Sequence, residues 1–310
     1  MGTKMDLTTE AKPFLKWVGG KGQLLRQLEA ALPKELSFTE FTYFEPFIGG
    51  GAMLFFMLKK FPNIQRVVIN DINKNLTEAY RVIKETPEDL VSALRNIERC
   101  YYNLTKELSR KDFYLEKRVL FNEAILSSVD KTALLLFLNK TCFNGMYREN
   151  TKGMFNVPFG KYQHPTICDE KVIYADSLLL NHFNVEIMTG DYWLTSNAIN
   201  DGEYNFFYFD PPYRPLNKTS SFNSYVKDIF DDSSQRSLAK FCRFISERHN
   251  CLWMLSNSDC SSKNPADLFF ETIYEGFDFQ RVFATRSINA QPNKRGKLTE
   301  LLIRNYTIDL

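Results

Sequence analysis

Short apolar runs that stop at polar or acidic residues alternate along the chain with stretches whose apolar residues recur at helical spacing. The short runs predict buried strands starting at residue 41 and at 66–70, 185–188, 205–209, 251–255, 280–286 and 298–304. The helical stretches predict helices at 23–32, 53–60, 131–139 and 233–248. Strands that alternate with helices in this way favour an α/β fold.

One part of the chain interrupts this alternation. Residues 73–127 are polar and strongly helical, and a glycine-containing loop at 142–162 follows the next predicted helix. We interpret both as parts of an insertion. The expected division is an α/β domain of residues 11–80 and 166–310, with a mainly helical domain of residues 81–165 inserted in it.

The predicted strand at 205–209 ends at Asp210, which is followed by Pro211, Pro212 and Tyr213. Open α/β sheets bind ligands at the carboxyl ends of their strands, and two successive prolines stiffen the backbone there. The Asp210 carboxylate and the Pro211 carbonyl can each accept a hydrogen bond from an exocyclic amine, while Tyr213 stacks on the ring. The motif therefore fits a planar base that carries an amino group. The alternative is a proline-terminated strand with a surface aspartate.

Two glycine-containing segments precede this motif. In the first, a glycine pair leads to Lys21 before a predicted helix, an arrangement that can bind a phosphate or a carboxylate. In the second, Glu45 ends a strand, three glycines follow at 49–51, and Asp71 ends the next strand. Asp71 stands where α/β folds hydrogen-bond a ribose, and Glu45 suits an amino group, so an adenosyl amino acid fits this segment. A plain strand, turn and helix is the alternative.

The loop at 142–162 interleaves aromatic residues, Asn, Arg, Lys and glycines. Arg and Asn contact base edges, Lys contacts phosphates, and an aromatic side chain can insert between bases. This composition is typical of a loop that binds nucleic acid. A glycine-rich surface hairpin packed on the helices would share it.

Composition limits the remaining possibilities. The chain has 310 residues, 44% hydrophobic and 25% charged, and its net charge of +2 is too small to identify a nucleic-acid partner. Its six cysteines form no C-x-x-C pair and its three histidines stand apart, so a metal site is not expected. No apolar run approaches the ~20 residues that span a bilayer, and we expect a cytoplasmic protein.

Taken in order, these segments closely resemble the DNA adenine methyltransferase (Dam-like) family over residues 14–306. The matching motifs are FLKWVGGK at 14–21, EPFIGGGA at 45–52, NDIN at 70–73, FNGMYREN at 143–150, GMFNVPFG at 153–160, DPPY at 210–213 and TELLIRNY at 299–306. The resemblance implies a Rossmann-like methyltransferase domain, a mixed sheet with helices on both faces, that carries an inserted DNA target-recognition domain.

The resemblance also implies S-adenosylmethionine as the methyl donor and the N6 amine of adenine as the acceptor. The implied catalytic residues are Asp210, Pro211, Pro212 and Tyr213. The implied cofactor-binding residues are Trp17, Lys21, Glu45, Phe47, Gly49, Gly51, Asp71, Asp191 and Asp210. The mechanism expected is direct in-line transfer, without a metal, in which positioning is the enzyme's main contribution.

The implied partner is double-stranded DNA, from which the target adenine must be flipped. The family's wedge position falls on Phe143, its base-contacting positions fall on Asn144, Met146 and Arg148, and a flanking-base contact falls on Lys16. The implied target is GATC or a related site. A cognate restriction endonuclease acting separately stays open, and we expect a monomer or weak dimer.

Two other interpretations stay open at this stage. A methyltransferase that acts on RNA or on a protein glutamine amide can use a similar Pro-Pro-aromatic motif, although the basic and aromatic loop speaks against a protein acceptor. A DNA-binding regulator that has lost catalysis could keep the same scaffold, although the intact motif at 210–213 argues against it.

Overall fold

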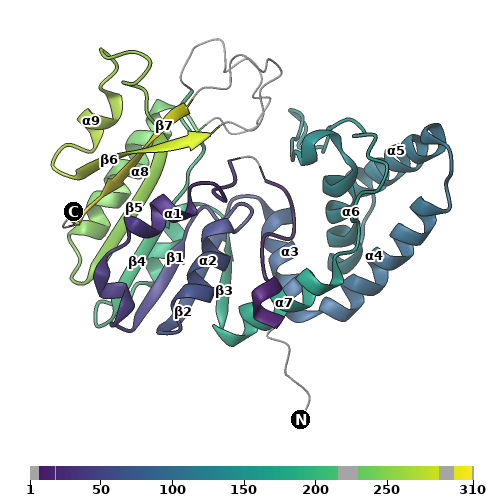
Figure 1. Ribbon diagram of the computed structural model, residues 1–310, viewed down its shortest axis with the longest axis horizontal. Helices are drawn as coiled ribbons and strands as arrows, with labels where there is room; N and C mark the ends of the chain where they lie inside the picture. The colour runs from purple at the N-terminus through teal and green to yellow at the C-terminus, as the bar shows by residue number, and fades with distance from the viewer. Residues whose placement is uncertain (1–6, 18, 216–229, 286–296, 309–310) are drawn as a thin grey trace.

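A seven-stranded mixed sheet forms the centre of the protein (Figure 1). The computed structural model describes residues 7–17, 19–215, 230–285 and 297–308. The strands are β1 (Phe41–Glu45), β2 (Ile64–Asp71), β3 (Val185–Thr189), β4 (Tyr204–Phe209), β5 (Cys251–Ser258), β6 (Asp278–Thr285) and β7 (Lys297–Arg304), in the order β3-β2-β1-β4-β5-β7-β6. All seven predicted strands are confirmed, although residue 286 of the expected sixth strand lies outside the described residues. The four pairings among β1 to β5 are parallel, and β7 runs antiparallel to both β5 and β6.

Successive side chains of the central strands enter two different cores, because side chains alternate across a sheet. Tyr43 and Phe206 join the core formed with α1 (Leu25–Ala30), α2 (Ala52–Lys60), α3 (Lys74–Glu85) and α7 (Glu170–His182). Their neighbours Phe44 and Phe207 join a second core with α8 (Asp232–Ser246) and α9 (Phe269–Ile273). The sheet is therefore covered by helices on both faces, as the resemblance implied.

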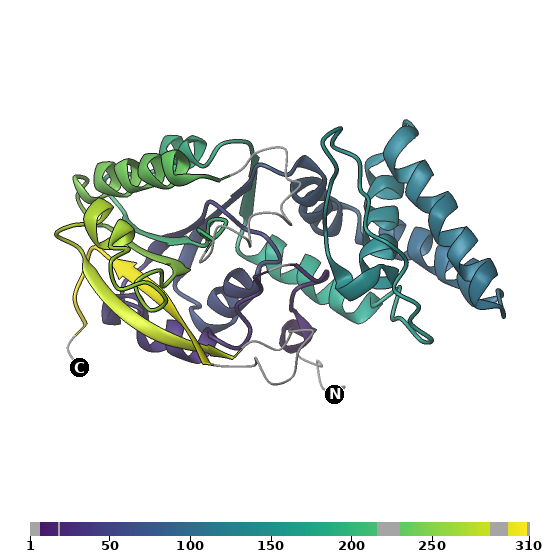
Figure 2. The ribbon, with the colours of Figure 1, turned by 90° about the horizontal axis from the view of Figure 1, so that it is seen from above.

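A helical unit of α4 (Pro87–Tyr102), α5 (Glu107–Glu123) and α6 (Ser128–Thr141) extends to one side of the sheet (Figures 1 and 2). Helix α6 contacts α3, α4 and α5. One core runs without interruption from the sheet through α3 and α7 to this unit. The expected boundary at residue 81 falls within α3, so the separation into two domains stays a prediction.

The helical elements differ from the sequence predictions in a few places. Helix α1 covers only Leu25–Ala30 of the predicted 23–32, and α7 was not predicted at all. Short 3-10 turns occur at Leu7–Glu10, Lys34–Ser37, Phe143–Gly145 and Tyr192–Ala198. Helix α7 has a weak amphipathic signal because it buries polar residues, Asp176 and Ser177, among its apolar ones. No helix in the described ranges is both long enough and apolar enough to cross a bilayer.

Helix α6 generates a stability prediction. Phe137 is fully buried and its ring lies 5.6 Å from that of Phe113 and 5.7 Å from that of Tyr101. We expect Phe137→Ala to lower the free energy of unfolding by about 3–5 kcal/mol, because it leaves a cavity in the core. Leu108→Ala, at a 71% exposed position of α5, should change it by less than about 0.5 kcal/mol. Urea denaturation measures both, and equal losses would contradict the packing described for α6.

Candidate functional site

Four acidic residues gather at the carboxyl edge of the parallel strands. Glu45 and Asp71 are the last residues of β1 and β2, Asp210 directly follows β4, and Asp191 lies two residues beyond β3. Because parallel strands all end at the same edge, strand pairing brings together residues that are distant in sequence. The prediction that Asp210 follows the end of a buried strand is confirmed.

Asp210 forms an ion pair with Lys21 at this edge. The Lys21 Nζ lies 2.8 Å from Asp210 Oδ1 and donates to the Gly19 carbonyl at 3.0 Å. The lysine is 5% exposed, whereas the Asp210 side chain keeps 22% of its surface accessible. The anion that Lys21 was predicted to bind is therefore, in this structure, a carboxylate of the chain itself.

The surroundings of Asp210 set its protonation. Burial raises the pKa of the Asp210 carboxyl above its usual range, while Lys21 and the Ser256 hydroxyl, which donates to Oδ1 at 3.1 Å, oppose the rise. The Ser256 hydroxyl also lies 3.0 Å from that of Tyr208. The Asp210 carboxylate is thus partly accessible, and Lys21 and Ser256 both stabilise its ionised form.

The aromatic ring of the motif is fixed at two points. The Lys21 Nζ lies 4.4 Å from the centroid of the Tyr213 ring, within the range of a cation–π interaction. The Tyr213 hydroxyl donates to Glu300 Oε2 at 2.6 Å. The backbone before it is held as well, because Gln235 Nε2 donates to the Pro212 carbonyl at 3.0 Å. Tyr213 therefore has a defined orientation next to Asp210.

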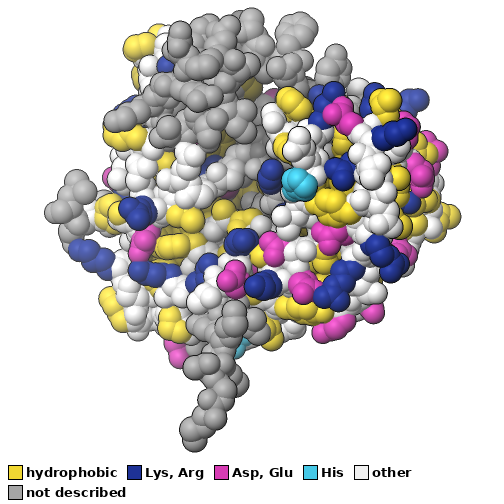
Figure 3. All heavy atoms as spheres, turned by 45° about the vertical axis from the view of Figure 1, so that its right-hand side comes forward, with side chains coloured by type: hydrophobic (Ala, Val, Ile, Leu, Met, Phe, Trp, Pro, Cys, Tyr) yellow, Lys and Arg dark blue, Asp and Glu magenta, His cyan; other side chains and the backbone are white. Residues whose placement is uncertain are grey.

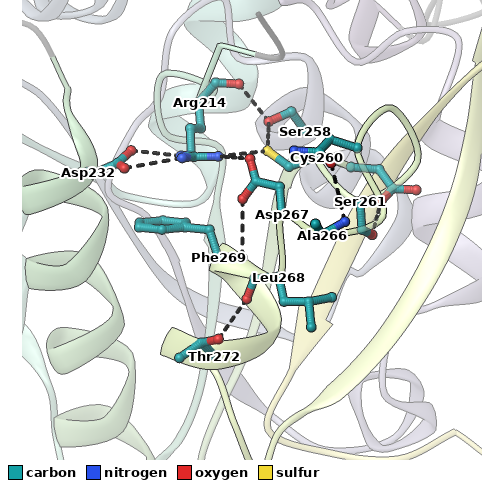
Figure 4. Close-up of polar contacts among 12 residues, drawn as sticks. Arg214, Asp232, Ser258, Cys260, Ser261, Ala266, Asp267, Leu268, Phe269 and Thr272 are labelled. Atoms are coloured by element: carbon teal, nitrogen blue, oxygen red, sulfur yellow. Dashed lines mark hydrogen bonds and ion pairs between the residues drawn. The ribbon is translucent and has the colours of Figure 1, made fainter.

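Arg214 fastens the end of the motif (Figure 4). Its guanidinium lies between Asp232, with Nε 2.7 Å from Oδ1, and Asp267, with Nη1 2.7 Å from Oδ2. It also lies 4.4 Å from the centroid of the Phe269 ring, and its carbonyl accepts from the Ser258 hydroxyl at 2.7 Å. These contacts join β5, α8 and the start of α9 to the residue that follows Tyr213.

The glycine turn after β1 has a backbone that only glycine adopts readily. Gly49 and Gly51 have φ of 47° and 74°. The Asp71 carboxylate accepts from the Gly49 N–H at 3.1 Å and from the Asn73 N–H at 2.9 Å. A Cβ at Gly49 would lie 3.0 Å from the Trp17 ring. The turn is thus tied to β2 by Asp71 and packed under Trp17, which brings four predicted cofactor residues together: Trp17, Gly49, Gly51 and Asp71.

The other predicted cofactor residues flank this turn. Glu45 is 2% exposed and accepts from the Tyr43 hydroxyl at 2.7 Å; burial raises its pKa well above the usual range, and the nearby Asp210 charge raises it further. The Phe47 ring lies 5.2 Å from that of Tyr192. Asp191 is exposed and caps the turn at Tyr192–Ala198 by accepting from the Trp193 N–H at 2.9 Å.

The predicted DNA-contacting residues cluster around a short turn, Phe143–Gly145, which we call the recognition turn. Phe143 is 50% exposed and Asn144 has a φ of 57°. Lys16 lies against this turn, because a Cβ at Gly145 would be 2.3 Å from its Cδ, and its Nζ lies 5.3 Å from the centroid of the Tyr162 ring. Lys16, Phe143 and Asn144 are therefore neighbours.

Two of the predicted residues lie just beyond the recognition turn. Met146 and Arg148 are half-buried. Arg148 Nε donates to Asn156 Oδ1 at 2.7 Å, and its Nη2 donates to the Asn156 carbonyl at 3.3 Å. The guanidinium is thus oriented across the loop by its own hairpin partner. Roles in base contact remain predictions for all five residues.

Charges of both signs cover this side of the molecule. Figure 3 shows Lys and Arg side chains dispersed among Asp and Glu, with apolar side chains between them. Several acidic and basic groups pair, as in Arg95 with Glu170 and Lys161 with Glu107. Among the described residues on the face that Figure 3 shows, no large patch carries charges of a single sign.

Sequence reasoning missed several polar residues that hold the site. They are Asn139, Gln235, Ser256, Asn257 and Glu300, each of which bonds to a predicted site residue or to its immediate neighbour. The one available signal was position, because Ser256 and Asn257 stand near the end of a predicted strand. Gln235 and Asn139 lie within helices, where a polar residue usually indicates a solvent-facing position.

Comparison with known proteins gives consistent matches over nearly the whole chain. The family model described as D12 class N6 adenine-specific DNA methyltransferase matches residues 17–288. The Type II methyltransferase M.MjaIII of Methanocaldococcus jannaschii is 46% identical over 301 residues, 96% of this chain and 100% of that protein. The Type II methyltransferase M1.LlaDCHI of Lactococcus lactis is 37% identical over 95% of each chain. The DNA adenine methylase of Escherichia coli is 30% identical over 94% of each chain.

The glycine turn generates a prediction of its own. A Cβ at Gly51 would lie 2.4 Å from the Tyr80 hydroxyl, at a φ of 74°. We expect Gly51→Ala to lower the free energy of unfolding by about 1–3 kcal/mol. Tyr80→Phe removes the clashing oxygen, so the same substitution should cost less in that background. Chemical denaturation measures the series, with Gly22→Ala as control because a Cβ at Gly22 meets nothing within 4 Å. Equal costs in both backgrounds would exclude the clash.

Proposed function

Because this chain belongs to the D12 class of N6 adenine-specific DNA methyltransferases, we propose that it transfers the methyl group of S-adenosylmethionine to the N6 amine of a flipped-out adenine in duplex DNA. The observation that carries the proposal is Asp210 at the end of β4, paired with Lys21 and followed by an oriented Tyr213. The chain has the complete motif at 210–213, which is why we favour an active enzyme over a regulator without catalysis.

The residues around the glycine turn fit an adenosyl cofactor. The turn keeps its shape because Gly49 and Gly51 have φ of 47° and 74°, where a residue with a side chain would be strained and would clash with Trp17 or Tyr80. We assign Asp71 to the ribose hydroxyls, Glu45 to the amino group, and Trp17 and Phe47 to apolar contacts, with Lys21, Gly49, Gly51, Asp191 and Asp210 completing the site. When bound, the cofactor supplies a methyl group activated by its positive sulfonium.

The motif at 210–213 acts on the adenine amine. This amine is a weak nucleophile because its lone pair is conjugated with the ring. Asp210 and the Pro211 carbonyl accept hydrogen bonds from its two N–H groups, which orients the nitrogen and increases its electron density. Tyr213 stacks on the ring, and Glu300 and Lys21 hold that tyrosine in place. Positioning therefore contributes most of the acceleration.

The DNA-contacting side of the proposal centres on the recognition turn. Removing a base from the duplex costs a few kcal/mol, which an inserted aromatic side chain can offset by filling the gap. We assign this wedge to the exposed Phe143. Asn144, Met146 and Arg148 are assigned to base edges and Lys16 to a flanking base, with residues 81–165 as the target-recognition domain and GATC or a related sequence as the site.

The biological setting follows from the same reasoning. Two of the similar proteins are named Type II methyltransferases and one is named a DNA adenine methylase. We propose that this enzyme works in the cytoplasm as a monomer or weak dimer, and that a cognate restriction endonuclease acts separately on the same site.

The proposal is tested by following labelled methyl from S-adenosylmethionine into duplexes that differ only by the presence of GATC. We expect label only in the GATC duplex, recovered as N6-methyladenine after digestion. Label in adenine of both duplexes would retain the activity and reject the site. Label in RNA alone, or in no nucleic acid, would reject the proposed substrate.

Asp210→Ala is the matched loss-of-function variant. We expect methyl transfer to fall at least about a thousandfold, because the amine loses its main hydrogen-bond acceptor. DNA affinity, measured by fluorescence anisotropy, should be retained. Asp201→Ala serves as control, since Asp201 is an exposed aspartate paired with Arg248 in the turn before β4. Turnover close to that of the parent enzyme would rule out the role assigned to Asp210.

The ion pair gives a pH prediction. Burial raises the pKa of Asp210 and Lys21 opposes that rise, so removing the ammonium should raise this pKa further. Activity that needs the carboxylate is lost as pH falls through its pKa. We therefore expect Lys21→Met to move the acidic limb of the kcat profile to higher pH, while Lys21→Arg keeps it near the parent position. The profile is measured at saturating cofactor, and an unmoved limb in Lys21→Met would contradict this.

A further inference from the structure

A single buried amide joins the two functional parts of the molecule. Asn139 lies in the last turn of α6 and is 1% exposed. Its Oδ1 accepts from the Lys16 N–H at 2.8 Å, and its Nδ2 donates to the Lys16 carbonyl at 2.9 Å. The second hydrogen of Nδ2 goes to the Gly145 carbonyl at 3.0 Å. Both donors and one acceptor position of the side chain are thus in use.

The geometry of these bonds is specific to asparagine. The amide pairs with both polar groups of one Lys16 peptide backbone, as a neighbouring strand would, and still has a donor for Gly145. An aspartate would place an oxygen against two carbonyl oxygens. A leucine, which has the same number of side-chain heavy atoms but no polar group, would leave all three backbone groups without this hydrogen-bond partner, and each loss would destabilise the fold.

The two segments that Asn139 joins serve different parts of the proposed reaction. Lys16 precedes Trp17, whose ring lies against Gly49 and stacks on Tyr147 at 5.2 Å. Gly145 ends the recognition turn, and the Lys16 side chain crosses it so closely that a Cβ at Gly145 would be 2.3 Å away. The Asn139 amide therefore fixes the position of the recognition turn relative to Lys16 and Trp17, the segment that packs on the glycine turn.

We propose that Asn139 is a positioning residue that determines how well the enzyme discriminates its target sequence, by holding the recognition turn against Lys16. The inference rests on the proposed function, because it assigns base contacts to residues around that turn. Discrimination by direct contact requires placement of the contacting groups within a fraction of an ångström. If the recognition turn is not held by α6, the free energies of its contacts with a correct and an incorrect base differ less.

The test compares Asn139→Asp and Asn139→Leu with the parent enzyme. The readout is the ratio of kcat/KM for a duplex carrying the preferred site to that for the same duplex with one base pair changed. We expect this ratio to fall by about tenfold or more, the factor that corresponds to the loss of one to two net hydrogen bonds. The change should appear mainly in KM for DNA, because Asp210 and Tyr213 are untouched.

Asn205 supplies the matched control. It is also a fully buried asparagine whose Nδ2 donates to two backbone carbonyls, those of Asn200 and Glu203, both at 2.9 Å. It lies at the start of β4, at the opposite end of that strand from Asp210. Asn205→Asp should lower thermal stability but leave the discrimination ratio unchanged. Similar loss of discrimination in Asn205→Asp and Asn139→Asp would overturn the proposal, since general destabilisation would explain both.

A second readout does not depend on activity. In the parent protein the Lys16 amide hydrogen is bonded to Asn139, so it should exchange slowly with solvent. In Asn139→Leu, faster exchange is expected in peptides covering residues 13–17 and 143–146, with other core peptides unchanged. Unchanged exchange there, or an active variant with full discrimination, would overturn the inference. Failure of the proposed function is distinct, because the parent enzyme would then methylate no DNA.

Discussion

The buried ion pair between Lys21 and Asp210 is the interaction on which the geometry of the site depends. An ammonium with 5% exposure is costly to bury without a counter-charge, and here its contacts are Asp210, the Gly19 carbonyl and the face of Tyr213. The pair draws the segment before α1 across the carboxyl ends of β4 and β1. Trp17 is thereby placed on the glycine turn, and one wall of the site comes from a segment outside the sheet.

Strand order decides where that pair lies. The chain places β2 and β3 on one side of β1, and β4 and β5 on the other, so the direction of winding changes between β1 and β4. Such a point leaves a crevice outside the strand ends, because the connections depart in opposite directions. Glu45 ends one of these strands and Asp210 follows the other. Glu45 and Asp210 thus flank the crevice in which open α/β sheets bind their ligands.

Much of this arrangement could be predicted from the sequence. The acidic residues at or directly after strand ends, Glu45, Asp71 and Asp210, are local features of the sequence, and parallel pairing alone brings them to one edge. The pairing of Lys21 with Asp210 could not be predicted, since it joins distant segments and lysine before a helix equally suits an external anion. Asn139 and Glu300 are missed for a related reason: their roles come from what faces them in the folded chain. Helix α7 escaped because its buried Asp176 and Ser177 weaken the periodic pattern.

Positive charge is dispersed on the face that Figure 3 shows, so under the proposed function the contacts near the recognition turn matter more for binding DNA. Affinity for DNA normally comes from many phosphate contacts by lysine and arginine, and it is then indifferent to sequence. Figure 3 shows acidic side chains among the basic ones on the helical side. Paired charges such as Arg95 with Glu170 contribute little to such attraction. Under the proposed function, discrimination between sequences then rests on the placement of the groups assigned to base edges, and that placement requires rigid connections to the core. Tyr147 provides one such connection, because its ring stacks on Trp17 and its hydroxyl accepts from Asn75 of α3 at 3.1 Å. Tyr147, two residues beyond the recognition turn, therefore links this loop both to α3 and to Trp17, which packs on the glycine turn.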